Sequence, residues 1–304
     1  MGGAGSGSSF QANIAALQKK RFNMRVMHGI TRPDTSTTLF GKKLTLPLLA
    51  APVGGVWYNM TRRLKEQDFI AAVVQGCKEA GIIGCLGDGE LEEIFDSACA
   101  TLQVYGGWGI PFIKPWQEGE ALRKIERMRL SGIDTVGMDI DAAGLITLHQ
   151  MGKPVYPKTQ KELARIINAA GVQFIVKGIM TVDEAKAALD AGAAGIVVSN
   201  HGGRVLDHTP GTADVLPAVA EAVGAHLTVL ADGGVRTGGD ILKMMALGAH
   251  GVMAGRPFAI SAIGGGADGV RQRSEKFQRE LVQAMILTGC GSISGVSSSI
   301  LYRE

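Results

Sequence analysis

The feature that most constrains this chain is a regular alternation of short apolar runs and amphipathic segments from residue 48 onward. The apolar runs have the length and composition of parallel strands that are buried on both faces. The amphipathic segments have apolar residues at positions i, i+3 and i+4, which is typical of helices that cover a sheet. The predicted strands are Leu48–Ala51, Ile82–Leu86, Pro111–Ile113, Thr135–Ile140, Phe174–Lys177, Gly195–Ser199, Leu227–Ala231 and Gly251–Ala254.

Helices are predicted between these strands. They are Asp68–Glu79, Leu91–Ala100, Glu118–Leu130, Gln160–Ala169, Val182–Leu189, Ala213–Ala222, Gly239–Leu247 and a long last one from about Gly269 to Leu287. Thr181 and Thr237 are expected to cap helices at their start, and Gly192 and Gly248 to end them. Eight strand–helix units in a little over 250 residues predict an α/β fold, a (β/α)₈ barrel. A doubly wound open sheet is the alternative, but no glycine fingerprint follows the first strand.

The part of the chain before the barrel is predicted to be short and simple. A helix is expected at Phe10–Lys19, and a β-hairpin over residues 37–46 that turns at Gly41-Lys42. With 46% hydrophobic and 19% charged residues, the composition is that of a globular protein with a large core. We therefore expect residues 1–304 to form a single domain.

Charge and cysteine content exclude several classes of partner. The formal net charge is +3, with no run of basic residues, so no nucleic-acid partner is expected. We find no signal peptide and no apolar run of membrane length, so no membrane partner is expected either. The four cysteines form no CxxC pair and lie in mostly apolar contexts, which indicates reduced thiols and a cytoplasmic protein.

The hexapeptide Ser199-Asn200-His201-Gly202-Gly203-Arg204 follows a buried strand and is the strongest candidate for a site. A histidine can move a proton near neutral pH, and an arginine can bind a carboxylate through two parallel hydrogen bonds. The two glycines allow the backbone to approach a flat ligand closely. The same residues are also ordinary turn residues, so the hexapeptide alone leaves a structural role open.

Other polar residues follow the remaining strands, at the end of the barrel where active sites lie. They are Pro52-Val53-Gly54-Gly55, Lys114, Trp116, Asp139, Asp141, Lys177, Asp232-Gly233-Gly234-Val235-Arg236 and Gly255-Arg256. Glycines with an arginine after the last two strands favour a phosphate site, with two ordinary turns as the alternative. Lys177 is expected to point into the site, although a structural ion pair with Asp139 or Asp141 would also explain it. Asp141 could hold the His201 ring in one tautomer.

Four motifs resemble the FMN-dependent α-hydroxy acid oxidases and dehydrogenases, such as glycolate oxidase, lactate oxidase and flavocytochrome b2. They are Ile175-Val176-Lys177-Gly178, Val197 to Asp207 around Asn200-His201-Gly202-Gly203-Arg204, Ala231-Asp232-Gly233-Gly234-Val235-Arg236, and Gly255-Arg256-Pro257. The resemblance is nearly continuous from Gln173 to the C-terminus and weaker from Gly3 to Asp141. It implies a (β/α)₈ barrel with FMN across the strand ends, and a homo-oligomer, a tetramer as in the family.

The resemblance also implies roles for individual residues. Lys177 would stabilise negative charge at the N1/C2-carbonyl edge of the flavin, and His201 would be the base, paired with Asp141. Arg204 would bind the substrate carboxylate. Apart from the resemblance, their place at a neighbouring strand end suggests Lys114 and Trp116 as further substrate contacts, with simple packing as the alternative. The residues expected to bind the cofactor are Pro52, Val53, Gly54, Lys114, Asp139, Lys177, Ser199, Asp232, Gly234, Arg236, Gly255 and Arg256. No metal is expected.

The departures from the family pattern lie mainly in the substrate half. Lys114 and Trp116 stand where the family has Gln-x-Tyr, Asp139 replaces a threonine near the flavin, and Gly87 replaces a serine. A second carboxylate-binding arginine has no counterpart near Leu148, and only about 35 residues separate Asp141 from Lys177, so a long loop of the family is largely missing. The family's first active-site tyrosine would precede Met1, so the chain is expected to begin inside the fold.

Three functional hypotheses follow. The first is an FMN-dependent oxidoreductase that oxidises a small 2-hydroxy acid or a close analogue, with His201 as the base. The second is an FMN-dependent isomerase or reductase with another class of substrate on the same barrel. The third is a non-catalytic flavin- or phosphate-binding protein, which would not need His201, Arg204 and Lys177 together.

Overall fold

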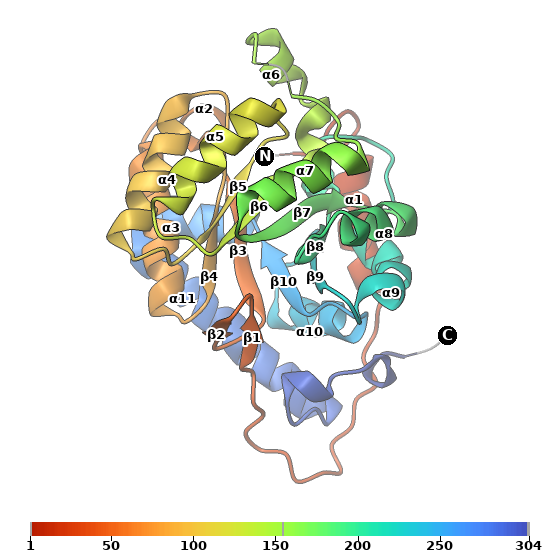
Figure 1. Ribbon diagram of the computed structural model, residues 1–304. Coiled ribbons are helices and arrows are strands. Elements are labelled where there is room, and N and C mark those ends of the chain that lie inside the picture. Colours follow the sequence, from red (N-terminus) through yellow and green to blue (C-terminus); the bar gives the residue numbers. More distant parts are fainter. Residues whose placement is uncertain (1, 154, 303–304) are drawn as a thin grey trace.

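A computed structural model describes residues 2–153 and 155–302 as a closed barrel of eight parallel strands ringed by helices (Figure 1). The strand order is β10-β3-β4-β5-β6-β7-β8-β9, so each strand pairs with the next in the chain and the last closes on the first. The strands are β3 (Leu48–Val53), β4 (Ile83–Leu86), β5 (Ile110–Ile113), β6 (Thr135–Asp139), β7 (Gln173–Ile179), β8 (Gly195–Val198), β9 (Thr228–Ala231) and β10 (Gly251–Ala254). The expected (β/α)₈ barrel is confirmed. Met1, Pro154, Arg303 and Glu304, which the predicted domain includes, lie outside the described residues.

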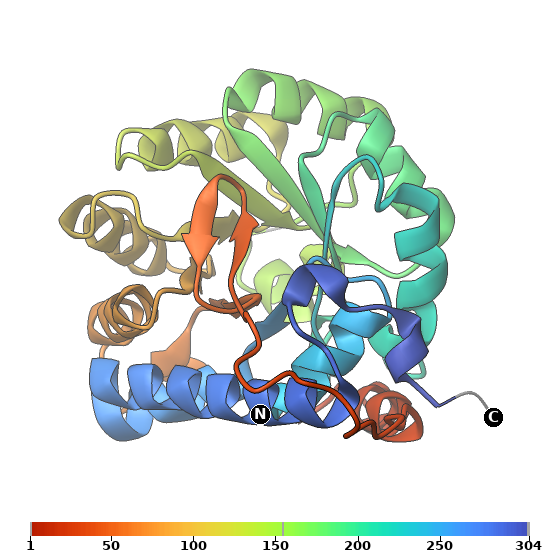
Figure 2. The same cartoon turned by 90° about the horizontal axis from the view of Figure 1, so that it is seen from below.

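Helices cover the outside of the barrel and bury its apolar outer surface (Figure 2). They are α1 (Ser8–Lys19), α2 (Val56–Asn59), α3 (Glu66–Glu79), α4 (Glu92–Val104), α5 (Glu118–Arg129), α6 (Ile146–Gln150), α7 (Gln160–Ala170), α8 (Val182–Asp190), α9 (Thr212–Val223), α10 (Gly238–Ala246) and α11 (Arg256–Thr288). Short 3₁₀ turns are η1 (Ile140–Gly144), η2 (His201–Gly203), η3 (Ile293–Gly295) and η4 (Ser298–Ile300). The Thr181 and Thr237 side chains accept hydrogen bonds from backbone N–H groups three residues on, as the cap prediction requires.

The sequence pattern predicts a start for the last helix at about Gly269, which is 13 residues later than its start in the structure. It begins at Arg256 directly after β10, and it is interrupted only at Gly266, where φ is 59°. Pro257 at the first turn favours a start there, because its missing N–H group would have no partner at that position anyway. The run Gly264-Gly265-Gly266 interrupts the apolar periodicity, so the sequence pattern does not predict that the helix continues through it.

The hairpin closes the N-terminal end of the barrel. Its strands are β1 (Thr37–Leu39) and β2 (Lys42–Leu44), and Leu39 pairs with Lys42, so the turn is Phe40-Gly41 rather than Gly41-Lys42. Both turn residues have positive φ, 50° and 76°, as a two-residue hairpin turn requires. Leu39, Phe40 and Leu44 pack into the core inside the barrel with residues such as Phe112. The opposite end of the barrel remains open for a site.

Candidate active site

An open cavity lies at the C-terminal ends of the strands and encloses about 610 Å³ of space free of protein atoms. Ten of the predicted site residues line it: Pro52, Val53, Lys177, His201, Arg204, Asp232, Gly234, Arg236, Gly255 and Arg256. Parallel strands with the same direction bring their ends together, which explains why residues spread over 200 positions meet here. The other six predicted residues, Gly54, Lys114, Trp116, Asp139, Asp141 and Ser199, do not line this cavity.

One end of the cavity has the features of a phosphate site. Gly233 and Gly234 adopt φ values of 97° and 80°, which favour glycine and turn the backbone after β9 toward the cavity. The N-terminus of α11 begins at Arg256, and a helix of this length presents free N–H groups and a positive dipole end there. Arg236 and Arg256 add two guanidinium groups, and burial lowers the pKa of both. An anion at this position would offset that unfavourable desolvation.

A row of charged side chains lies beside the cavity, and two of its members, Lys177 and Asp232, line it. The Lys114 Nζ lies 2.8 Å from Asp139 Oδ2, and the Lys177 Nζ lies 3.3 Å from Asp139 Oδ1 and 3.8 Å from Asp232 Oδ2. Asp139 and Lys177 are paired residues of β6 and β7, so the strand register itself sets this contact. The ion pair that the sequence left as an alternative for Lys177 therefore exists, and Lys177 lines the cavity as well.

These contacts control the protonation of the row. Burial alone would raise the pKa of Asp139, but attraction to Lys114 and Lys177 outweighs it and holds that pKa well below its usual range. Burial would lower the pKa of Lys177, yet Asp139, Asp141 and Asp232 hold it above its usual range. Burial raises the pKa of Asp232, against the opposing effect of Lys177. Lys177 is thus a permanent cation at the cavity wall.

The His201 ring is held by Asp141, as predicted. The His201 Nδ1 lies 3.0 Å from Asp141 Oδ1, and both side chains are largely buried. A neutral ring that donates from Nδ1 has its acceptor lone pair on Nε2. Gly178 makes this pairing possible, because a Cβ at that position would lie 2.6 Å from the Asp141 side chain.

The turn that presents His201 and Arg204 is a left-handed stretch of backbone. His201, Gly202 and Gly203 have φ values of 56°, 64° and 79°, and the His201 N–H donates to Ser199 Oγ at 3.1 Å. A positive φ at a non-glycine residue is unfavourable and persists only where surrounding contacts impose it. Arg204 follows as an exposed side chain on the cavity wall, and no partner for its guanidinium occurs among residues 2–153 and 155–302.

Contacts from the N-terminal segment impose that turn, and sequence reasoning missed them. The Ala4 N–H donates to the Gly203 carbonyl oxygen at 2.7 Å, and the Ser6 N–H and Oγ donate to Asp207 Oδ2 at 2.6 and 2.7 Å. A buried pair, Asn13 and Asn200, exchanges two side-chain hydrogen bonds behind it. The small polar residues of the first nine positions gave no sign of a distant partner.

Asp139, Asp141 and His201 could each offer one ligand atom to a metal, since those atoms lie within 4.8 Å of one another. Each group already has a partner, however: Asp139 contacts two ammonium groups, and Asp141 contacts the His201 ring. An added cation would meet Lys177 at close range. The donor set therefore favours an ion-pair network.

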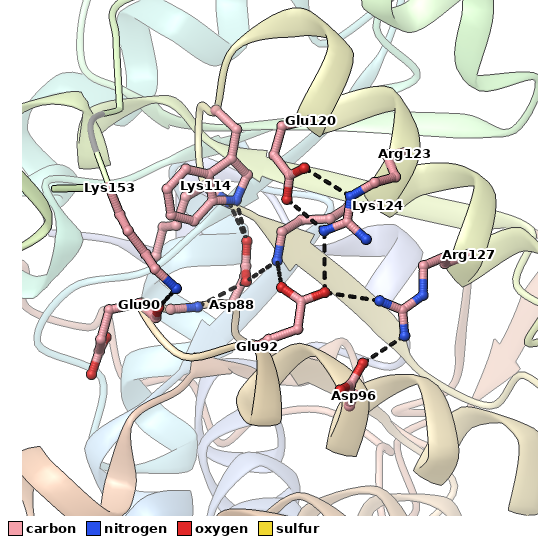
Figure 3. Close-up of polar contacts among 12 residues, drawn as sticks. Asp88, Glu90, Glu92, Asp96, Lys114, Glu120, Arg123, Lys124, Arg127 and Lys153 are labelled. Atoms are coloured by element: carbon pink, nitrogen blue, oxygen red, sulfur yellow. Dashed lines mark hydrogen bonds and ion pairs between the residues drawn. The ribbon is translucent and has the colours of Figure 1, made fainter. Parts of the chain in front are cut away.

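Trp116 belongs to a second polar cluster around Asp88, and Figure 3 shows Asp88 with its neighbours Lys124 and Glu92. The Trp116 Nε1 donates to Asp88 Oδ2 at 2.6 Å, and the buried Lys124 donates to Asp88 Oδ1 at 3.0 Å. Trp116 and Lys124 line a separate open cavity of about 680 Å³ together with Glu90, Glu92 and other residues. Asp88 was overlooked in the sequence, although it follows a strand by two residues like the predicted site residues.

Fold and site together point to an enzyme class: an α/β barrel with a cavity whose glycine turns and arginines suit a phosphate group, and whose wall carries a His–Asp pair and a buried lysine. The comparison with known proteins is more specific. The chain matches the FMN-dependent dehydrogenase family over residues 1–153 and 145–303 and belongs to that family. It is therefore an oxidoreductase, and FMN is its cofactor.

The relatives are hydroxy acid oxidases and dehydrogenases by name. The chain is 32% identical to an L-lactate oxidase of Lacticaseibacillus rhamnosus, over 97% of this chain and 86% of that protein. It is 30% identical to a 4-hydroxymandelate oxidase of Amycolatopsis orientalis, over 96% of this chain and 89% of that protein. This chain superimposes on a crystal structure of mandelate oxidase with a TM-score of 0.84 and 29% sequence identity. The alignment covers 100% of this chain and 92% of the mandelate oxidase chain.

The residues of this cavity fit FMN. The glycine turns, the α11 N-terminus and the two arginines suit its phosphate. Asp232 lines the cavity, and its Oδ1 is a buried acceptor with no hydrogen-bond partner among the described residues, so it could accept from a hydroxyl of the cofactor. Lys177 presents a cation to the cavity, which would suit the electron-accepting ring system.

Proposed function

We propose that this enzyme oxidises a small 2-hydroxy acid, with Arg204 binding the carboxylate and His201 accepting a proton. The single observation that supports this most is that Arg204, whose guanidinium has no partner among the described residues, and the His201–Asp141 pair lie close together beside Lys177. An isomerase or reductase on the same barrel is not favoured, because the named relatives are oxidases and dehydrogenases.

The residues of the chain divide the work of such an oxidation. Arg204 can orient a carboxylate through two parallel hydrogen bonds. His201 Nε2 can take the proton that leaves the substrate, and Asp141 stabilises the ring once it is charged. FMN, when bound, supplies the acceptor for the two electrons. Lys177 places a fixed positive charge where negative charge develops.

The decisive experiment mixes the FMN-loaded protein anaerobically with a panel of 2-hydroxy acids and follows the loss of flavin absorbance. We expect bleaching with at least one of them, and bleaching slowed by about 10²-fold or more in His201→Asn, which removes the base but keeps a polar side chain. Arg204→Lys should mainly raise KM, because an ammonium cannot form the paired contact. If no 2-hydroxy acid reduces the flavin while dithionite does, the proposed substrate class is wrong.

We propose that the FMN phosphate binds between Gly234, Arg236, Gly255 and Arg256. Charge-assisted hydrogen bonds to a phosphate contribute about 1.5–3 kcal/mol each. Arg236→Ala and Arg256→Ala should therefore each weaken FMN binding about tenfold or more in a fluorescence titration. Arg279→Ala, an exposed arginine on α11, serves as the control and should leave the affinity unchanged. Equal affinity in all three variants would place the phosphate elsewhere.

We further propose that residues 1–304 form one FMN-binding domain of a cytoplasmic homo-oligomer, a tetramer as the family resemblance implies. Support comes from four free, buried cysteines and from exposed apolar side chains at Met24, Val26 and Met27. Within the described ranges, no helix is both long and apolar enough to cross a membrane. Sedimentation velocity tests the assembly, and a monomer at micromolar concentration would contradict it.

A further inference from the structure

Asp139 is the centre of a buried charged row that lies behind the cavity wall. It is 1% exposed and contacts two ammonium groups, Lys114 at 2.8 Å and Lys177 at 3.3 Å. Three neighbouring strands deliver these groups, since Lys114 follows β5, Asp139 ends β6 and Lys177 lies in β7. The pairing of these three strands therefore places a cation, an anion and a second cation side by side at the barrel mouth.

Only one of the three side chains faces the cavity. Lys177 lines it, whereas Lys114 and Asp139 do not. The Lys114 side chain is only 10% exposed, and its ammonium is already bound to Asp139. It is therefore badly placed to bind a substrate carboxylate, and Arg204 remains the exposed cation at the cavity for that purpose.

The row changes the electrostatic field that Lys177 exerts. Reduction of a flavin adds negative charge to its ring system, so a nearby cation favours the reduced form and a nearby anion opposes it. Asp139 stands next to Lys177 where the family resemblance implies a neutral threonine, and it cancels part of the lysine's field. Lys114, on the far side of Asp139, restores part of it. Burial keeps all three charges poorly screened by salt.

We propose that Asp139 and Lys114 set the reduction potential of the bound flavin through Lys177, with Asp139 lowering the potential and Lys114 raising it. Neither residue needs to contact the substrate in this role. The inference rests on the proposed function in one respect, namely that FMN places its ring system against Lys177.

The test measures the reduction potential of the FMN-loaded protein by equilibration with a reference dye at pH 7. Asp139→Asn, which keeps the shape and an oxygen acceptor for Lys114, should raise the ratio of reduced to oxidised flavin at a fixed potential at least tenfold. For a two-electron couple this corresponds to about 30 mV. Lys114→Met, which removes the cation at similar length, should lower the ratio by a comparable factor.

The double variant Asp139→Asn/Lys114→Met removes one charge of each sign and should return close to the wild-type potential. If one single variant fails to load FMN, the double variant is compared with the other single variant, and the difference between their potentials gives the effect of the missing substitution. Asp214→Asn, an exposed position on α9, is the control and should leave the potential unchanged. Shifts of the same sign in both single variants, or no shift in either, would overturn the inference.

A steady-state measurement separates this inference from the proposed function. Lys114→Met should leave KM for a 2-hydroxy acid within about threefold of wild type, whereas loss of a carboxylate contact would raise it by tenfold or more. Opposite potential shifts with no turnover of any 2-hydroxy acid would support the inference and contradict the substrate class. Turnover of a 2-hydroxy acid with unchanged potentials would do the reverse.

Discussion

At the scale of single residues, the buried carboxylates Asp139 and Asp141 should make the protein sensitive to acid. Neighbouring cations hold the pKa of both below the value of about 3.9 expected for an unfolded chain. As the pH falls through about 4 and below, the unfolded chain binds protons that the folded protein does not, so the free energy of unfolding decreases. The raised pKa of Asp232 acts in the opposite direction, since its contribution is present at low pH and lost as pH rises.

We therefore predict that the urea midpoint is nearly constant from pH 7 to pH 5 and drops steeply toward pH 3. Asp139→Asn should be less stable at pH 7 but should lose up to about 1.2 kcal/mol less between pH 5 and pH 3, because an unfolded carboxyl with a pKa of about 3.9 takes up most of a proton over that range. Asp214→Asn should follow the wild-type profile. Parallel profiles for all three proteins would show that Asp139 has no lowered pKa.

At the scale of elements, the contact between α1 and the η2 turn holds the loop that carries His201 and Arg204. A Cβ on Gly203 would lie 2.4 Å from the Phe10 backbone nitrogen, and its φ of 79° disfavours any other residue. We predict that Gly203→Ala lowers the free energy of unfolding by about 2 kcal/mol or more through clash and backbone strain. It should also impair flavin reduction, because His201 and Arg204 flank this glycine.

Gly119→Ala is the matched control for that substitution. Gly119 lies in α5, and nothing lies within 4 Å of an added Cβ. Alanine is the better helix residue by about 0.5–1 kcal/mol, so this variant should be neutral or slightly more stable. Equal stability of the two variants in urea unfolding would contradict a tight α1–η2 contact.

The start of α10 depends on a capping box. The Thr237 side chain accepts from the Asp240 N–H at 3.2 Å, and the Asp240 side chain accepts from the Thr237 N–H at 2.9 Å. We predict that Thr237→Ala lowers the free energy of unfolding by about 1 kcal/mol, while Thr237→Ser costs less because it keeps the acceptor. Since α10 directly follows the turn at Gly233–Arg236, where we propose that the FMN phosphate binds, the affinity of Thr237→Ala for FMN should fall as well. An unchanged urea midpoint would show that the cap contributes nothing.

At the scale of the whole molecule, the cofactor should stabilise the fold as a ligand of the native state alone. FMN at 100 times its Kd should add about 2.7 kcal/mol to the free energy of unfolding. We therefore predict a rise in Tm of about 5 °C or more upon FMN addition to the flavin-free protein. Riboflavin, which lacks the phosphate, should raise Tm much less, and an equal rise with both would contradict the phosphate site.

The spacing of apolar residues was enough to predict the barrel. A strand that is buried on both faces requires a continuous apolar run, and a helix that covers it requires apolar residues on one side. The strands were all found, with ends displaced by one or two residues, and the polar residues after them identified Lys177, His201 and Arg204. Parallel strands place their C-terminal ends at the same end of the barrel, so the sequence alone could predict that these residues lie near one another. The start of α11 was missed because a glycine run conceals helical spacing, and the hairpin turn was misplaced by one residue because Phe40 adopts a positive φ.

Only the tertiary structure decided which neighbour each charged residue has. Lys114 could equally have faced the substrate, and its pairing with Asp139 follows from the register of β5 against β6. Trp116 bonds to Asp88 and lines a separate cavity, and Ser6 bonds to Asp207 across 201 residues of chain. Such contacts require segments far apart in sequence to be placed to within a few tenths of an ångström. Local spacing determines where a side chain leaves the backbone, but the packing of the closed barrel determines what it meets.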